Sequence, residues 1–165
     1  MTLSMSLSAS DLERAVKDFD PKQGYTILMT WWDRATKYAK GELRARTPAT
    51  IRRKVYVKVD AVRPPRWARV GVRSPLTWLI EGGTGQLGDP TFNHNPRFFP
   101  NVDGRFGIME QTGLPRSRAF LVARQIFLQG GTRPRPFVRP TYDAVRGRVA
   151  QMGDEIVREV TGATP

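Results

Sequence analysis

His94 is the most versatile side chain in this sequence, because an imidazole can bind a metal ion or transfer a proton near neutral pH. It is the one histidine of the chain and lies in an Asn-His-Asn run within a glycine-rich stretch. The chain has no cysteine, which excludes a disulfide framework, a thiolate zinc site and a cysteine nucleophile. With no second histidine and no clustered carboxylates beside it, we interpret His94 as a surface residue.

The run Gly82-Gly-Thr-Gly85 is similar to a phosphate-binding loop but lacks the required spacing and lysine. The acidic residues occur singly except for Asp154 and Glu155, which a helix would place on different faces. Paired acid–base catalysis therefore has no visible residues. We predict a protein with no enzymatic activity, no cofactor and no metal.

Basic side chains give the strongest signal for a binding surface. The chain has 27 Lys and Arg against 15 Asp and Glu, a net charge of +12, which favours a polyanionic partner. Between Arg44 and Arg73 only Asp60 is acidic, and Trp67 lies in the same stretch. The indole could stack on nucleic acid, or it could cover the core while the arginines form an ordinary solvated face. The predicted basic face, for DNA or an acidic partner, consists of Arg52, Arg53, Lys54, Lys58, Arg66, Arg69 and Arg73.

Helical and strand periodicities predict the elements that position these residues. A short helix over Ser10–Asp18 would begin with a capping box of Ser10 and Glu13. A longer helix over Lys22–Ala45 has an apolar stripe at steps of three and four. Alternating valines then predict two strands, Lys54–Asp60 and Trp67–Arg73, joined as an antiparallel pair. Leu76–Glu81 could form a third strand or a short helix.

Glycine and proline dominate residues 82–117, so we expect an irregular loop insertion there. A short helix over Arg118–Gln129, an extended stretch over Thr132–Pro140 and a final helix over Thr141–Val160 should follow. These elements predict an α+β fold with a small antiparallel sheet packed by the long N-terminal helix and the C-terminal helix. We expect a single domain over residues 1–165, organised as 1–21, 22–81, 82–117 and 118–165.

The proline-rich stretch that precedes the final helix is predicted to position that helix or to dock on a neighbouring copy. Its alternative is an ordinary helix start, with Pro140 just ahead of the first turn. Aromatic residues of the irregular loop would join the same contact, because they argue against a disordered segment. The predicted interface consists of Arg133, Pro134, Arg135, Pro136, Phe137, Arg139, Pro140, Phe98 and Phe99.

Three motifs follow one another along roughly residues 25–160. They are Ala45-Arg-Thr-Pro48-Ala-Thr50-Ile51-Arg52-Arg53-Lys-Val55; Val70-Gly-Val72 with Trp78-Leu-Ile-Glu81-Gly-Gly83-Thr84; and Pro134-Arg-Pro136-Phe137-Val138-Arg139-Pro140. Together they resemble a family of tailed-bacteriophage tail-component or neck (head–tail connector) proteins, related to the minor tail protein Z group of tail completion proteins. Within the second motif, Trp78, Glu81, Gly83 and Thr84 would form a structural turn, with Glu81 capping the turn or pairing an arginine.

The resemblance implies a virion protein that forms a ring of six or twelve copies around the DNA channel. Its neighbours would be head–tail connector, portal-side and tail-tube proteins, and passing double-stranded DNA is a further candidate partner. The chain has no apolar run of about 20 residues and no basic, apolar leader, so we expect assembly in the host cytoplasm without a membrane partner. Two alternatives stay open: a tail terminator that caps the tail tube, and a basic nucleic-acid-binding module.

Overall fold

The computed structural model describes residues 3–74, 76–89, 99–104 and 107–162. They cluster into two compact units. The helix–sheet unit is formed by Leu3–Val72 and Phe137–Pro165, and the inserted unit by Arg73–Pro136. The expectation of a single domain stays a prediction, since two compact units can belong to one domain.

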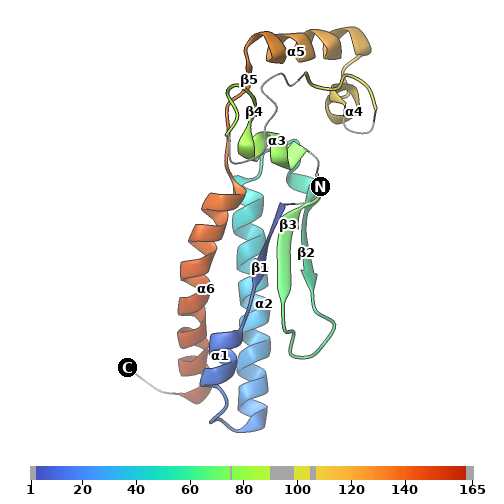
Figure 1. Ribbon diagram of the computed structural model, residues 1–165. Coiled ribbons are helices and arrows are strands. Elements are labelled where there is room, and N and C mark those ends of the chain that lie inside the picture. The colour runs from blue at the N-terminus through green and yellow to red at the C-terminus, as the bar shows by residue number, and fades with distance from the viewer. Residues whose placement is uncertain (1–2, 75, 90–98, 105–106, 163–165) are drawn as a thin grey trace. The chain divides into compact units, whose positions relative to one another are not determined.

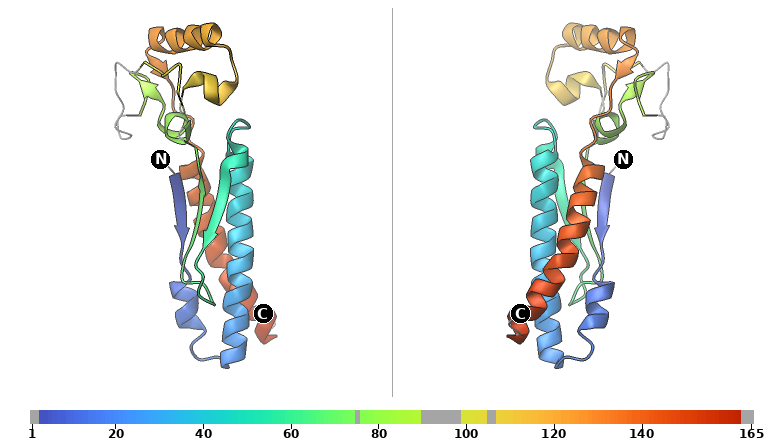
Figure 2. Two further views of the ribbon diagram at one scale, coloured as in Figure 1. Left: turned by 90° about the vertical axis from the view of Figure 1, so that its right-hand side faces the viewer. Right: turned by 90° about the vertical axis from the view of Figure 1, so that its left-hand side faces the viewer.

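A three-stranded antiparallel sheet and two long helices build the helix–sheet unit (Figure 1). The strands β1 (Leu3–Leu7), β2 (Val55–Val59) and β3 (Ala68–Val72) lie in the order β1-β3-β2. Helices α2 (Pro21–Arg46) and α6 (Val138–Thr161) pack against each other and against one face of the sheet (Figure 2). The predicted α+β fold is confirmed.

Helix α2 follows the predicted amphipathic pattern, with bounds that differ from the prediction by one residue at each end. The Asp20 side chain caps it by accepting hydrogen bonds from the backbone N–H groups of Lys22 and Gln23, at 2.9 and 3.4 Å. Pro21 fits the first turn, where its missing N–H has no helical partner to lose. The buried stripe consists of Gly24, Ile27, Leu28, Trp31, Trp32, Ala35, Ala39 and Leu43.

Helix α6 begins three residues before the predicted start, so the prediction that Thr132–Pro140 stays out of a helix is wrong at its end. Pro140 is the third residue of α6, within the first turn, where backbone N–H groups need no partner inside the helix. Beyond it the predicted stripe is buried along most of its length, at Val145, Val149, Met152 and Ile156.

The first strand was not predicted. Leu3, Met5 and Leu7 alternate with two serines, a period of two that a half-buried strand requires, and β1 pairs with β3 along its whole length. Helix α1 (Ser10–Ala15) follows, but the predicted capping box is wrong. The N-cap is Ala9, whose carbonyl oxygen accepts the Glu13 N–H at 2.8 Å, and no side chain caps this end.

The predicted strand pair is confirmed as β2 and β3, preceded by a short 3₁₀ turn, η1 (Arg52–Lys54). Their inward residues include Val70 and Val72, which are fully buried, while Arg69 beside them is exposed. One face of the sheet therefore belongs to the core, and the other carries polar side chains.

The inserted unit is built from short elements. Leu76–Gly82 forms the helix α3, which decides between the two predicted alternatives. The stretch expected to be irregular contains β4 (Thr84–Gly85) and α4 (Ile108–Thr112). Helix α5 (Arg116–Leu128) begins two residues earlier than predicted, and β5 (Gly131–Thr132) pairs with β4 in an antiparallel ladder.

Candidate interaction surfaces

The outward face of the sheet carries a row of polar side chains across all three strands. Arg69 on the central strand lies directly opposite Lys58 of β2 and Ser6 of β1, and all three residues are exposed. Among the described residues of the helix–sheet unit, α2 and α6 pack on the opposite face (Figure 2). This basic row (Lys58, Arg69 and Ser6) is therefore available to a partner.

Trp67 extends the basic row at one end of β3. Its backbone carbonyl oxygen accepts the Asp60 N–H at 3.0 Å, its side chain is 38% exposed, and Lys58 Nζ lies 5.8 Å from the ring centroid. That geometry is a cation–π contact. The ring is thus partly exposed beside Lys58, and the choice between the two interpretations of Trp67 stays a prediction.

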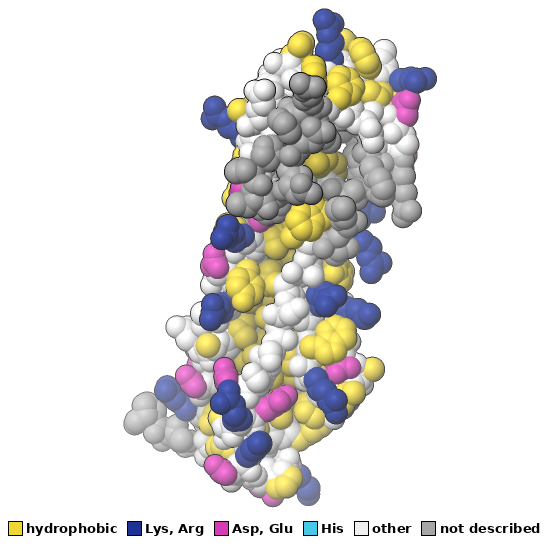
Figure 3. Space-filling view, in the orientation of Figure 1, with side chains coloured by type: hydrophobic (Ala, Val, Ile, Leu, Met, Phe, Trp, Pro, Cys, Tyr) yellow, Lys and Arg dark blue, Asp and Glu magenta, His cyan; other side chains and the backbone are white. Residues whose placement is uncertain are grey.

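The remaining predicted basic residues are less closely gathered. Arg53, Lys54 and Arg66 are exposed in turns of the helix–sheet unit, whereas Arg52 donates its Nε–H to the Thr47 carbonyl oxygen at 3.2 Å. Arg73 is exposed but belongs to the inserted unit. On the side of the helix–sheet unit shown in Figure 3, Lys and Arg side chains lie interleaved with Asp and Glu.

The second and third sequence motifs meet in the inserted unit. Thr84 Oγ1 lies 2.9 Å from Thr132 Oγ1 and accepts the Thr132 N–H at 3.0 Å. Gly83 has a φ of +69°, and a Cβ there would approach the Thr132 carbonyl oxygen to 2.4 Å. The Arg135 N–H donates to the Ile80 carbonyl oxygen at 2.7 Å. The predicted turn thus holds the proline-rich stretch against α3.

The side chains of the predicted turn motif are buried or half-buried. Glu81 and Thr84 are buried, and Trp78 is half-buried on α3. A buried carboxylate in a glycine-rich turn suits a structural role, because an unpartnered charge there would be costly.

The predicted interface residues are divided between the two units. Phe137 is 4% exposed, so its side chain belongs to the core of the helix–sheet unit and cannot anchor on a neighbouring copy. Arg139 and Pro140 lie in the first turn of α6. Arg133, Pro134, Arg135 and Pro136 follow β5, and Phe99 is exposed in the inserted unit. Phe98 lies outside the described residues.

Helix α5 carries an exposed apolar surface that was not predicted from the sequence. Phe120, Leu121 and Leu128 are 50%, 60% and 65% exposed. The Phe99 ring extends the surface, with centroids 6.3 Å from Phe120 and 5.6 Å from Phe127. We call this set the α5 apolar surface; it consists of Phe99, Phe120, Leu121, Phe127 and Leu128.

A cavity of about 740 Å³ lies within the inserted unit. Its lining is mainly aliphatic, from Leu76, Leu79, Ile80 and Ile126, with Arg133 and Arg135 among the polar contributors. The part of the lining that the structure describes includes threonine hydroxyls but no acidic or imidazole side chain that could act as a base beside them.

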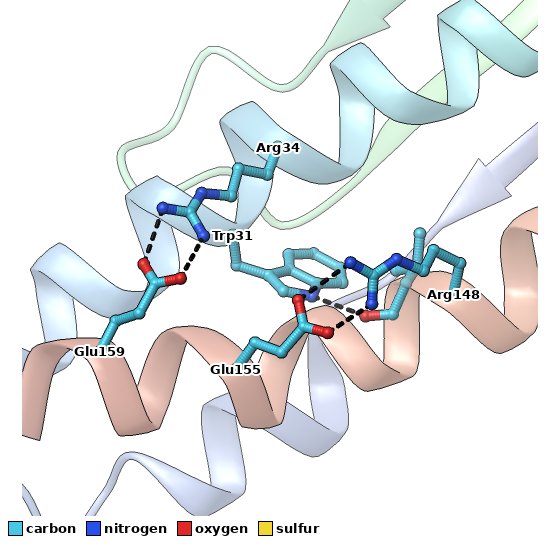
Figure 4. A network of polar contacts seen from close by, with 6 residues as sticks. Trp31, Arg34, Arg148, Glu155 and Glu159 are labelled. Carbon is cyan, nitrogen blue, oxygen red and sulfur yellow. Dashed lines mark hydrogen bonds and ion pairs between the residues drawn. The ribbon is translucent and has the colours of Figure 1, made fainter. Parts of the chain in front are cut away.

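The charged contacts of the two long helices are structural (Figure 4). Arg34 of α2 binds Glu159 of α6 with two hydrogen bonds of 2.9 and 2.7 Å. Along α6, Arg148 makes the same kind of bidentate contact with Glu155. These hydrogen bonds from Arg34 and Arg148 lower the pKa of Glu159 and of Glu155 and raise the pKa of each arginine.

The described residues contain no group of three or more His, Cys, Asp and Glu side chains that could hold a metal ion, and His94 lies outside them. None of the helices described is both long and apolar enough to cross a membrane. Comparisons with protein-family models, curated proteins and solved structures find no match to this chain.

Proposed function

We propose that this protein is a structural, non-enzymatic component of a tailed-phage particle. It would be a head–tail connector, or tail completion protein, whose copies assemble into a ring at the head–tail interface around the DNA channel. The α5 apolar surface carries the proposal, because large exposed apolar patches on soluble proteins mark interaction sites. Burying one Leu or Phe side chain contributes about 1.5–3 kcal/mol, so this surface can drive stable association.

The charges beside this surface favour head-to-tail contact. Arg118 and Arg124 are exposed on the same helix. Two copies that met through the same face would bring these arginines together, which disfavours a two-fold dimer. A different surface on the next copy avoids that repulsion, and a repeated contact between two different surfaces closes into a ring when the rotation allows.

The sequence motifs support the same class of protein. The turn motif around Glu81 and the stretch Pro134–Pro136, which lie far apart in the sequence, contact each other through Gly83, Thr84 and Thr132. The later part of the second motif and the first residues of the third therefore contact each other within the inserted unit. This is what a family-wide structural constraint would produce, and none of these residues needs to react with a substrate.

Native mass spectrometry of the purified protein over a range of concentrations tests the assembly. We expect one closed oligomer for the wild type and a monomer for L121K/L128K. The control is Y25K/V62K, which places two lysines at exposed apolar positions of the helix–sheet unit and should still assemble. Assembly of L121K/L128K like the wild type would show that α5 is not the contact.

Experiments with phage particles test whether the ring lies at the head–tail interface. Infections that lack the gene should yield filled heads without attached tails, and complementation should restore attachment. Tails of uncontrolled length would instead indicate a tail terminator. A protein that stays monomeric and is absent from mature particles would refute both.

A further inference from the structure

The outward face of the sheet holds two positive charges that nothing in the described structure neutralises. Lys58 and Arg69 are directly opposite each other on β2 and β3, both are exposed, and neither makes an ion pair within the described residues. Opposed residues on neighbouring strands have Cβ atoms about 4.5–5.5 Å apart, and like charges at that separation destabilise the pair. An acidic residue or a threonine at either position would make the strand pair more stable.

Asp60, which follows β2 in the sequence, contacts the β2–β3 connection. Asp60 Oδ1 and Oδ2 face the backbone N–H groups of Val62 and Arg66, each at 3.4 Å. The carboxylate therefore faces the β2–β3 connection, and within the described residues neither Lys58 nor Arg69 forms an ion pair with it. A polyanionic partner could supply the counter-charge.

An exposed aromatic ring lies at the end of the same row. Lys58 Nζ lies over Trp67, and Ser6 adds a hydroxyl on the other side of Arg69. Nucleic-acid-binding surfaces combine two kinds of group. Cations and hydroxyls bind phosphate oxygens, and a neighbouring aromatic ring stacks on a base or sugar.

We propose that the basic row and Trp67 bind the phosphate backbone of DNA. DNA carries one negative charge per roughly 1.7 Å of duplex axis, so adjacent phosphates can neutralise two cations at strand spacing. Trp67 adds a ring on which a base or sugar can stack, so we argue for DNA and make an acidic protein surface an outcome of the test. The inference goes beyond the proposed ring, whose contacts lie on α5.

Fluorescence anisotropy with a labelled DNA duplex, and with the single strand of the same sequence, tests the inference at several salt concentrations. We expect K58Q/R69Q to reduce affinity about tenfold and to reduce the salt slope by about two, one for each phosphate that is no longer neutralised. The control K40Q/R44Q removes the same charge from exposed positions of α2 and should change affinity less than about twofold. The two DNA forms report whether the row prefers a duplex or a separated strand.

Trp67 supplies a second readout. When Lys58 binds a phosphate, its ammonium group should move away from the Trp67 ring, which should change the fluorescence emission of the indole. The W67F variant should not show this change. Trp31 and Trp32 are buried in the core and should report little.

Three outcomes would overturn the inference. The first is that the protein does not bind DNA, and the second is that K58Q/R69Q and K40Q/R44Q lose the same amount of DNA affinity. The third is that the protein binds poly-glutamate more tightly than either DNA form and that this binding also depends on Lys58 and Arg69. The last result would assign an acidic protein partner. K58Q/R69Q should form the same oligomer as the wild type, so failure here is separable from failure of the proposed ring.

Discussion

The indole Nε1 of Trp31 donates a hydrogen bond of 3.1 Å to the backbone carbonyl oxygen of Val149. This contact joins α2 to α6 inside the core, where Trp31 also packs edge-on against Trp32 at 4.8 Å between ring centroids. A buried indole needs a partner for its N–H, so the bond fixes which turn of α6 lies against Trp31.

Replacing Trp31 with Phe should lower the free energy of unfolding by roughly 1–3 kcal/mol, because it removes the buried hydrogen bond and part of the ring volume. Urea denaturation of the two proteins measures the difference. The control W67F changes an exposed ring and should stay within about 0.5 kcal/mol. Equal effects of the two changes would contradict the assigned role of Trp31.

Gly131 should tolerate no side chain. Its φ is +111°, and a Cβ would come within 1.7 Å of the Thr84 carbonyl oxygen, so G131A must break the β4–β5 ladder. We expect G131A to lose cooperative unfolding of the inserted unit in thermal scans and hydrogen exchange. The control G147A lies on α6 with open space around it and should stabilise the protein by up to about 1 kcal/mol.

Removing one charge from the basic row should stabilise the fold. K58Q and R69Q should each raise the free energy of unfolding by a few tenths of a kcal/mol, because each relieves the cross-strand repulsion. The double variant should gain less than the sum of the two, since the repulsion can be relieved only once. Additive gains, or losses, in denaturation experiments would argue against repulsion between this pair.

The ion pairs of Glu155 and Glu159 with arginines should make the free energy of unfolding depend on pH. Because Arg148 and Arg34 lower the pKa of Glu155 and Glu159 below 4.5 in the folded chain, both contributions are present above about pH 4.5 and disappear as the pH falls through the lowered values. Both groups are exposed, so the effect should be small and should shrink in high salt. E155Q and E159Q should flatten the acidic limb of denaturation midpoints, and an unchanged limb in E155Q/E159Q would contradict the assignment.

Periodicity was enough to predict the two long helices and the β2–β3 pair. Helices α2 and α6 and strand β3 bury one face along most of their length, and β2 shows the same alternation although Val59 is exposed. The stripe around Trp31 repeats at helical steps, and the valines around Val57 alternate. The signal for β1 was equally present in Leu3, Met5 and Leu7, but the strand depends on pairing with β3, a long-range partner that local patterns do not reveal. Pro140 misled for a local reason, since proline interrupts the middle of a helix and fits its first turn.

Of the α5 apolar surface only Phe99 was predicted, and the residues on α5 itself could not be predicted from residue types. Phe120, Leu121 and Leu128 are residue types that occur on core faces as well as on binding faces, and only their exposure in the fold distinguishes the two. Phe137 shows the reverse case: it was predicted to anchor on a neighbour and is part of the protein's own core. The basic row was predicted as a basic stretch, but the opposition of Lys58 and Arg69 depends on strand register.

The division of the helix–sheet unit by residues 73–136 has a consequence during synthesis. Helix α2 and the β2–β3 pair are synthesised before the residues from Arg73 to Pro136. At about 5–20 residues per second, several seconds pass between the synthesis of the β2–β3 pair and that of α6, which supplies the hydrogen-bond partner of Trp31. During that interval the side of α2 that packs against α6 in the folded protein has no α6 to cover it.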